Sequence, residues 1–428
     1  MVLESYIEGE WQKGSGGATP LYHAVNGNEI AQISSTGIDF KGMLEYGRNV
    51  GGPSLRALTF HERARRIKAL AKYLMDRKEE FYKLSAATGA TKRDSWIDIE
   101  GGIGTLFSYS SKARRELPDE SFYVDGALEP LSKEGTFVGQ HLCVPLQGIA
   151  LHINAFNFPC WGMLEKIAPT LLAGVPAIVK PASLTAYLTE LMVRRIVESK
   201  LLPEGALQLI CGSVGDTFEH LTCQDIVTFT GSAQTGIKLK SHPNILTNSI
   251  RFNMEADSLN CSILGPDATP GKEEFDLFIR EVANEITVKA GQKCTAIRRI
   301  IVPEKLVSDV REALSERLRK VPVGDPTNEA VRMGPLAGKP QVEEVLSRVT
   351  QLAKECELIY GSVDNFDLIG ATKEKGAFCP PLLLYCDKPF SKMAVHETEA
   401  FGPVSTIIPY EKFTDAIELS KLGKGSLV

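Results

Sequence analysis

From Gly148 onward, short apolar runs alternate with longer segments whose apolar residues recur at helical spacing. The runs that predict strands are 149–153, 177–179, 207–210 and 226–229, and the helices predicted between them are 161–172, 185–199 and 216–221. Parallel strands joined by crossover helices turn in a right-handed sense and place helices on both faces of the sheet. The alternation therefore predicts an α/β fold with a covered parallel sheet.

The same alternation resumes after a break at 255–258. A strand at 261–264, a helix at 274–288 and a strand at 299–302 are expected there. Because 428 residues far exceed the roughly 150 of an average domain, we expect two α/β domains that divide near this break. An isolated β-hairpin arm is expected at 135–145.

The segments outside this alternation make further predictions. Thr59 and Glu62 have the spacing of a capping box, so a long helix is expected to begin there and to run to Gly89. Near the other end, 414–422 predicts a helix and 425–428 the opening of another strand. We therefore expect the second domain to lack its C-terminal part.

Charge and composition argue against several classes of protein. The chain has 48 Lys and Arg against 53 Asp and Glu, a formal net charge of −5, which is not typical of a nucleic-acid binder. No apolar run reaches the roughly 18 residues of a membrane span, and the first residues lack the apolar stretch of a signal peptide. The nine cysteines form no C-x-x-C pair and the seven histidines no H-x-x-x-H pair, so we expect a cytoplasmic protein without disulfides or a metal.

Three residues are candidates for covalent chemistry. Cys294 lies among small neighbours and beside Lys293, a setting that can expose and stabilise a thiolate nucleophile, although a buried inert cysteine is the alternative. Glu255, at the break, is either a general base or a surface carboxylate. Asn157 follows a strand and precedes a helix, where its amide could donate to an oxyanion or serve only as a turn or helix cap.

A second group of residues favours phosphate or ribose binding. Gly231, Ser232 and Gly236 belong to a turn that follows a strand and opens a helix, so its N–H groups could hold a phosphate. The spacing is neither the G-x-G-x-x-G fingerprint nor a Walker loop, and it also suits a plain turn. Lys180 ends another predicted strand and could reach a ribose or phosphate, or remain a solvated surface lysine.

In their order and context these segments resemble the aldehyde dehydrogenase superfamily, from about residue 5 to the last residue. The stretches that carry the resemblance are Phe-Asn-Phe-Pro at 156–159, Val-Lys-Pro-Ala at 179–182, Phe-Thr-Gly-Ser at 229–232, Glu255, Gly-Gln-Lys-Cys at 291–294, and Glu-Ala-Phe-Gly-Pro-Val at 399–404. The resemblance implies that Cys294 is the nucleophile, Glu255 the general base and Asn157 the oxyanion donor.

The resemblance also implies a cofactor site and an architecture. Gly231, Ser232 and Gly236 match the phosphate-side turn of the family's Rossmann-like domain, Lys180 the adenosine-ribose contact and Glu399 the nicotinamide-ribose contact. The implied domains are a cofactor domain of 1–120 and 146–256, a hairpin oligomerisation arm of 121–145 and a catalytic domain of 257–428. Since the family adds the arm to a partner's sheet, a homodimer or higher homo-oligomer is expected.

The residue three positions beyond Lys180 predicts the choice of nucleotide. A Glu there would bind the 2′-hydroxyl of NAD and repel a 2′-phosphate. This chain has Ser183, which removes the repulsion and can donate a hydrogen bond, while Lys180 can pair with the phosphate. We therefore expect NADP as the cofactor.

Within the superfamily the chain is most similar to the PaaZ-like group, the aldehyde dehydrogenase domains of bifunctional proteins of phenylacetate degradation. The distinctive stretches are 88–91, 94–104, 153–162 and 254–260. This likeness implies oxidation of a CoA-linked semialdehyde, 3-oxo-5,6-dehydrosuberyl-CoA semialdehyde, to the carboxylate. The alternatives are 3,4-dehydroadipyl-CoA semialdehyde from benzoyl-CoA breakdown, a plain aldehyde, and a non-catalytic binding protein on this scaffold. Members that pass the acyl group to free CoA generally lack Glu255, so hydrolysis is expected. The hydratase domain of PaaZ relatives is not expected within these residues.

Overall fold

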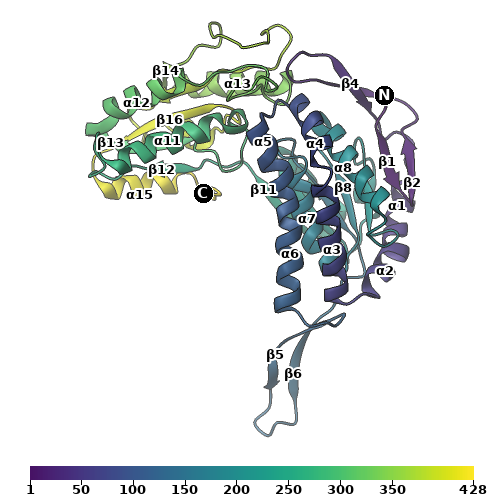
Figure 1. The fold of residues 1–428 in the computed structure, drawn as a ribbon. Helices are drawn as coiled ribbons and strands as arrows, with labels where there is room; N and C mark the ends of the chain where they lie inside the picture. The colour runs from purple at the N-terminus through teal and green to yellow at the C-terminus, as the bar shows by residue number, and fades with distance from the viewer. The chain divides into compact units, whose positions relative to one another are not determined.

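The computed structural model describes all 428 residues, which form two compact units (Figure 1). The first unit consists of Met1–Leu21, Ile30–Tyr82 and Trp96–Ala256, and the second of Tyr22–Glu29, Lys83–Ser95 and Asp257–Val428. Each unit has its own sheet and its own apolar core. The chain therefore has an α/β fold, as the alternating sequence predicts.

The first unit is built on a seven-stranded sheet with the strand order β11-β10-β7-β8-β9-β1-β2. Its strands are β1 (Glu4–Ile7), β2 (Glu10–Lys13), β7 (Ala150–Ile153), β8 (Ala177–Lys180), β9 (Leu207–Leu209), β10 (Ile226–Gly231) and β11 (Arg251–Ala256). The strands from β7 to β11 run parallel to one another. All of β7 and three of the four residues of β8 are buried, so helices cover both faces of the sheet's centre.

The second unit has a five-stranded sheet with the order β12-β13-β16-β15-β14. Its strands are β12 (Cys261–Ile263), β13 (Arg299–Pro303), β14 (Glu357–Tyr360), β15 (Leu382–Tyr385) and β16 (Val404–Tyr410). The central strands β13 and β16 are buried at every position and pair in parallel. Two small sheets complete the strands: β3 (Thr19–Tyr22) with β4 (Glu29–Ile33), and the hairpin β5 (Tyr123–Pro130) with β6 (Val138–Cys143).

The helices occupy most of the remaining chain. Before residue 257 they are α1 (Phe40–Tyr46), α2 (Gly52–Arg56), α3 (Phe60–Met75), α4 (Lys78–Ser85), α5 (Lys92–Trp96), α6 (Gly102–Glu116), α7 (Trp161–Leu172), α8 (Ala186–Ser199), α9 (Ala233–Lys240) and α10 (Pro243–Thr247). After it they are α11 (Glu273–Thr287), α12 (Val307–Arg319), α13 (Lys339–Leu352), α14 (Ala394–Glu397) and α15 (Phe413–Lys421). None of these helices is long and apolar enough to cross a membrane.

The predicted capping box is present at the start of α3. Thr59 Oγ1 accepts from the Glu62 N–H at 3.2 Å, and the Glu62 carboxylate accepts from the Thr59 N–H at 2.9 Å. The expectation of one helix up to Gly89 is wrong, because α3 ends at Met75 and α4 begins at Lys78. Asp76 and Arg77 separate the two helices. Gly89, with a φ of +86°, ends the short 3-10 turn that follows α4.

Close helix packing explains the glycines at 101 and 102, part of a stretch that the sequence marks as distinctive. A Cβ on Gly102 would lie 2.8 Å from the Trp161 Cα, and one on Gly101 would lie 2.5 Å from the Trp161 ring. These glycines therefore allow α6 to approach α7 more closely than any other residue would. Asp98, one turn earlier, accepts from the N–H groups of Cys160 and Trp161 and so fixes the start of α7.

The domain boundaries differ from the prediction in one respect. The first unit ends at Ala256, yet 22–29 and 83–95 belong to the second unit and not to the first, to which 1–120 was assigned as a whole. Backbone hydrogen bonds explain this: Ala24 donates to Ala87, and Ala377 donates to Ala24. Such long-range pairing leaves no periodic trace in the sequence.

Three further local predictions need correction. β1 and β2 at one side of the first sheet and the edge strand β14 of the second pair in antiparallel fashion, so neither sheet is wholly parallel. The segment predicted as a helix over 216–221 is a short 3-10 turn at Thr217–His220. Residues 425–428 form no strand, because the N–H groups of Leu427 and Val428 donate to the side chains of Ser258 and Asn260.

Candidate functional site

Four of the predicted site residues follow neighbouring parallel strands of the first sheet. Lys180 is the last residue of β8 and pairs with Ile153, the last residue of β7, which lies four residues before Asn157. Glu255 of β11 pairs with Thr230 of β10, directly before Gly231. The carboxyl ends of adjacent parallel strands form one edge of a sheet, and sites in α/β proteins form at that edge.

The Asn157 loop is held from several sides. Asn157 itself is buried, with 7% of its surface exposed. Thr185 donates to the Phe156 carbonyl at 3.1 Å and Thr189 to the Pro159 carbonyl at 3.1 Å. These bonds to its neighbours fix the backbone on both sides of Asn157.

The turn after β10 is a capped helix start. Ser232 is the N-cap of α9, and its hydroxyl accepts from the Thr235 N–H at 3.4 Å. A Cβ on Gly236 would lie 2.5 Å from the Met254 sulfur, so the glycine lets α9 pack directly on β11. Gly231, Ser232 and Gly236 thus form the strand–turn–helix arrangement in which backbone N–H groups can face an anion.

Lys180 and Ser183 line one cavity, and the whole cavity lies within the first unit. It has a volume of about 280 Å³. Its lining contains one cation, several hydroxyl groups and no carboxylate: Gly17, Thr19, Ile33, Ser34, Ser35, Thr36, Lys180, Ser183, Gly212 and Ser213. No hydrogen bond or ion pair holds the ammonium group of Lys180, and burial lowers the pKa of this lysine. An uncompensated cation among hydroxyl groups is suited to an anionic ligand.

Residues that the sequence did not single out form much of the cavity wall. The Ser35 hydroxyl donates to the Ser213 carbonyl at 2.8 Å and so ties the segment after β4 to the loop after β9. Gly212, with φ +143°, allows this approach, because a Cβ there would lie 2.6 Å from the Ser35 nitrogen. Both wall segments are irregular in conformation, so no periodic pattern reveals them.

In the second unit, hydrogen bonds to side chains fix the loop that carries Cys294. The Lys289 N–H donates to the buried Asp94 carboxylate at 2.8 Å. Asn260 donates through its side-chain amide to the carbonyls of Cys294 at 2.8 Å and Ala296 at 3.0 Å. The loop also contains a left-handed Gly291, where a Cβ would lie 2.1 Å from the Gly402 carbonyl oxygen. The nucleophile candidate therefore belongs to a fixed loop, and its own surface is partly exposed.

The lysine beside Cys294 does not have the role that the sequence suggests. The Lys293 ammonium pairs with both oxygens of Glu285, at 2.7 and 2.8 Å, so its charge is largely compensated. A different cation, Arg298, reaches the loop: it donates to the carbonyls of Gly291 at 2.9 Å and Lys293 at 3.3 Å.

Arg298 also holds Glu399, the predicted ribose contact. Its Nε donates to Glu399 Oε1 at 3.2 Å, and the other carboxylate oxygen accepts from the Ser258 N–H at 3.0 Å. Burial raises the pKa of Glu399, and the Arg298 charge opposes that shift. Cys294 and Glu399 are thus linked through one buried arginine.

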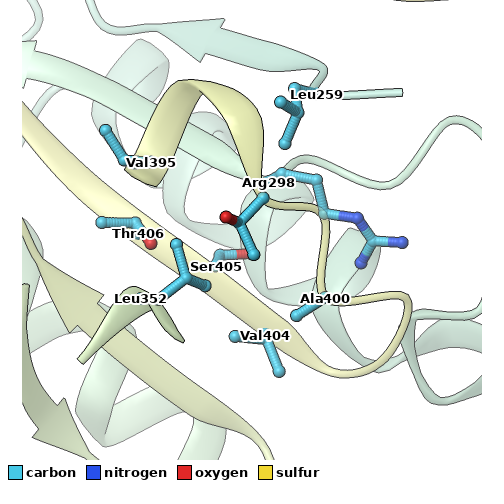
Figure 2. Close-up of a pocket in the computed structure, with 9 residues that line it drawn as sticks. Leu259, Arg298, Leu352, Val395, Ala400, Val404, Ser405 and Thr406 are labelled. Atoms are coloured by element: carbon cyan, nitrogen blue, oxygen red, sulfur yellow. The ribbon is translucent and has the colours of Figure 1, made fainter. Parts of the chain in front are cut away.

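The space beside Arg298 is too small for a substrate. A cavity of about 10 Å³, roughly the size of one water, is lined by Leu259, Arg298, Leu352, Val395, Thr398, Ala400, Val404, Ser405 and Thr406. Figure 2 shows that the guanidinium of Arg298 points away from Val395 and Thr406. A role for Arg298 therefore depends on its guanidinium group, which makes the hydrogen bonds, and not on this small cavity. The signal in the sequence that could have drawn attention to Arg298 is a pair of successive arginines at the start of a buried strand.

Comparisons with known proteins address the family to which the chain belongs. The aldehyde dehydrogenase family profile matches residues 11–422. The chain is 44% identical to 3,4-dehydroadipyl-CoA semialdehyde dehydrogenase of Aromatoleum evansii over 100% of this chain and 83% of that protein. It is 27% identical to alpha-ketoglutaric semialdehyde dehydrogenase of Bacillus subtilis over 97% of this chain and 82% of that protein.

Solved structures extend the likeness to the fold. A betaine aldehyde dehydrogenase from Staphylococcus aureus, in complex with NAD+, superposes with a TM-score of 0.84 at 22% identity, covering 98% of this chain and 82% of that one. The two units of the chain therefore have a fold that is known from solved structures. The chain belongs to the aldehyde dehydrogenase family.

Proposed function

We propose that this protein oxidises a CoA-linked semialdehyde to the corresponding carboxylate with NADP. The observation that carries the substrate class is the 44% identity, over the whole chain, to a 3,4-dehydroadipyl-CoA semialdehyde dehydrogenase. The PaaZ-like stretches of the sequence support 3-oxo-5,6-dehydrosuberyl-CoA semialdehyde as the preferred member of that class. The relative's own substrate, 3,4-dehydroadipyl-CoA semialdehyde, is the second candidate.

Cys294, Asn157 and Glu255 are the proposed catalytic residues. The Cys294 thiolate attacks the aldehyde carbon, and the Asn157 amide donates to the oxyanion that forms. Loss of hydride from that carbon leaves a thioester on Cys294. Glu255 then accepts a proton from water, which attacks the thioester and releases the carboxylate. The fixed loops of Asn157 and Cys294 support these roles, since both groups must keep a defined position.

The cavity around Lys180 supports NADP as the cofactor. NADP, when bound, would supply the hydride acceptor. The cavity offers Lys180 and Ser183 to a 2′-phosphate and has no carboxylate in its wall to repel one. Because Lys180 lacks an anionic partner within the protein, a phosphate would compensate its charge. These features fit the phosphorylated nucleotide better than NAD.

The remaining cofactor contacts follow the family's motif positions. The turn of Gly231, Ser232 and Gly236 would hold the pyrophosphate through backbone N–H groups. Glu399 would accept from the nicotinamide ribose. Each oxygen of Glu399 already accepts one hydrogen bond, and a carboxylate oxygen has room for a second, so this contact is compatible with the Arg298 pair.

We also propose that the β5–β6 hairpin serves assembly of a homodimer or a higher homo-oligomer. The two strands pair only with each other and expose apolar side chains: Val124, Leu128, Leu131, Phe137, Val138 and Leu142. An exposed apolar ribbon with free strand edges is suited to adding to a sheet of a second copy.

The substrate proposal is tested by comparing four aldehydes under one set of conditions. We expect kcat/KM to be highest for 3-oxo-5,6-dehydrosuberyl-CoA semialdehyde, then for 3,4-dehydroadipyl-CoA semialdehyde, and to fall steeply for the free semialdehyde acid and for a plain aldehyde. Equal kcat/KM for a CoA-linked semialdehyde and its free acid would refute the substrate class. Detection of an acyl-CoA product from added free CoA would refute the hydrolytic step.

A further inference from the structure

Arg298 lies between two parts of the second unit that the proposed function uses separately. On one side it holds Glu399, the proposed ribose contact, at 3.2 Å. On the other side it donates to the carbonyls of Gly291 and Lys293, which precede Cys294 in the same loop. It also donates to the Gly402 carbonyl at 2.8 Å, so the planar guanidinium reaches four acceptors: one carboxylate and three backbone carbonyls.

Among the charged groups around Cys294, Arg298 is the cation that acts on the thiolate. The side chains of Arg298 and Glu399 are 4% and 8% exposed, so water screens their interaction weakly. Burial lowers the pKa of Arg298, while Glu399, Glu285 and the Cys294 thiolate act to raise it. Lys293 is paired with Glu285, and Asp257 is the other carboxylate that acts on Glu399.

From this arrangement we propose that Arg298 is a positioning residue that sets the geometry of the Cys294 loop and stabilises its thiolate, with Glu399 moderating that effect. The inference deepens the proposed function and rests on Cys294 as its nucleophile. It adds a physical link between the nucleotide-side carboxylate and the nucleophile. A change in the charge or position of Glu399 would then be transmitted to Cys294 through a single side chain.

The proposal predicts opposite effects for the two members of the ion pair. Arg298→Met removes the cation, so the thiolate should become less stable. Glu399→Gln keeps the shape of the side chain and removes its charge, so the Arg298 cation acts on the thiolate without compensation. Loss of packing alone would not move the thiol in opposite directions in these two variants.

The test measures the alkylation rate of Cys294 against pH in the full chain, without substrate or nucleotide. Peptide mass spectrometry assigns the label, and the exposed Cys143 and Cys223 serve as internal references. We expect the midpoint of the Cys294 profile to rise by about one pH unit in Arg298→Met and to fall in Glu399→Gln. Profiles of the two reference cysteines should remain unchanged.

Two further variants separate charge from geometry. Arg298→Lys keeps the charge, so the midpoint should stay near the wild-type value. One ammonium cannot reach the four separated acceptors of Arg298, so the loop should loosen and the plateau rate should increase. Arg299→Lys is the matched control, because Arg299 is equally buried and donates to the carbonyls of Leu259 and Leu419 without touching the Cys294 loop. It should leave the Cys294 profile unchanged.

An unchanged midpoint in Arg298→Met, or a shift of the same sign in Glu399→Gln, would overturn the proposal. If Arg298→Met does not fold, the Glu399→Gln variant alone tests the proposal. An unchanged or raised midpoint of its Cys294 profile would then refute the link between Glu399 and Cys294. The readout uses neither aldehyde nor NADP. Failure of the proposed function would instead appear as catalytic activity that survives Cys294→Ala.

Discussion

Replacing Ser183 with Glu is expected to turn the nucleotide preference of the protein from NADP towards NAD. Ser183 and Lys180 line one cavity of about 280 Å³ that contains no carboxylate. A carboxylate at position 183 would face the proposed 2′-phosphate site and would also pair with Lys180. The substitution therefore adds a repulsive charge and withdraws the only cation from the phosphate.

The size of this effect follows from Coulomb's law. Two unit charges about 5 Å apart, at an effective dielectric constant of about 20, repel by roughly 3 kcal/mol. Pairing of the new carboxylate with Lys180 offsets part of this, so a net loss of about 2 kcal/mol is expected. That corresponds to roughly 30-fold weaker binding of NADP. NAD has no 2′-phosphate, and a carboxylate can accept from its 2′-hydroxyl, so its binding should stay equal or improve.

Fluorescence titration with NADP and with NAD measures the two dissociation constants directly, without turnover. Ser183→Ala is the matched control, because it removes the hydroxyl without adding charge and should weaken NADP by only about 1 kcal/mol, or roughly fivefold. Equal weakening of NADP and NAD by Ser183→Glu would refute the assignment of this cavity to the 2′-phosphate. Unchanged binding of both nucleotides would refute it as well.

Three further predictions concern stability. Asp225→Asn should destabilise the first unit by about 3 kcal/mol in urea unfolding, because it leaves the Arg48 cation without the fully buried carboxylate that pairs with it; a change below about 0.5 kcal/mol would contradict this. Burial lowers the pKa of His152 from 6.5 to about 3. Between these pH values the unfolded state binds a proton that the folded state does not, so stability should be lost as the pH falls from 6.5 towards 3. His152→Gln should show a shallower loss of Tm over that range, and an identical slope would contradict the prediction. Gly291→Ala should prevent correct folding of the Cys294 loop, seen as a lower Tm and lost activity, since its Cβ would meet the Gly402 carbonyl; a variant with wild-type Tm and activity would contradict it.

The sequence predicts the parallel core of the first unit because β7 and β8 are short, mainly apolar runs that are buried almost throughout. Such runs can be recognised from the sequence without knowing what they pair with. The sequence does not predict β1 and β2, which are four residues long and only partly buried. The strand predicted at 425–428 is absent, because side chains of Ser258 and Asn260 satisfy its N–H groups. The local sequence pattern does not show that distant side chains will accept hydrogen bonds from these N–H groups.

The same contrast holds for the site. Lys180 and Asn157 could be placed at the carboxyl edge of a sheet, because each follows a strand that the sequence predicts. The strand that carries Glu255, β11, was not predicted. Arg298 could not be assigned a role, since Glu399 lies 101 positions away in the sequence. Likewise, the sequence places Lys293 beside Cys294, but only the fold shows that Glu285 compensates its charge.

The most direct test of the proposed function is the rate of NADPH formation from NADP and a CoA-linked semialdehyde, for the wild type and for Cys294→Ala. The proposed mechanism predicts that the wild type forms NADPH together with the free carboxylate. It also predicts that Cys294→Ala, at an unchanged Tm and an unchanged affinity for NADP, loses activity by at least about a thousandfold. A folded Cys294→Ala variant with wild-type turnover would contradict the assignment of the nucleophile and with it the proposed mechanism.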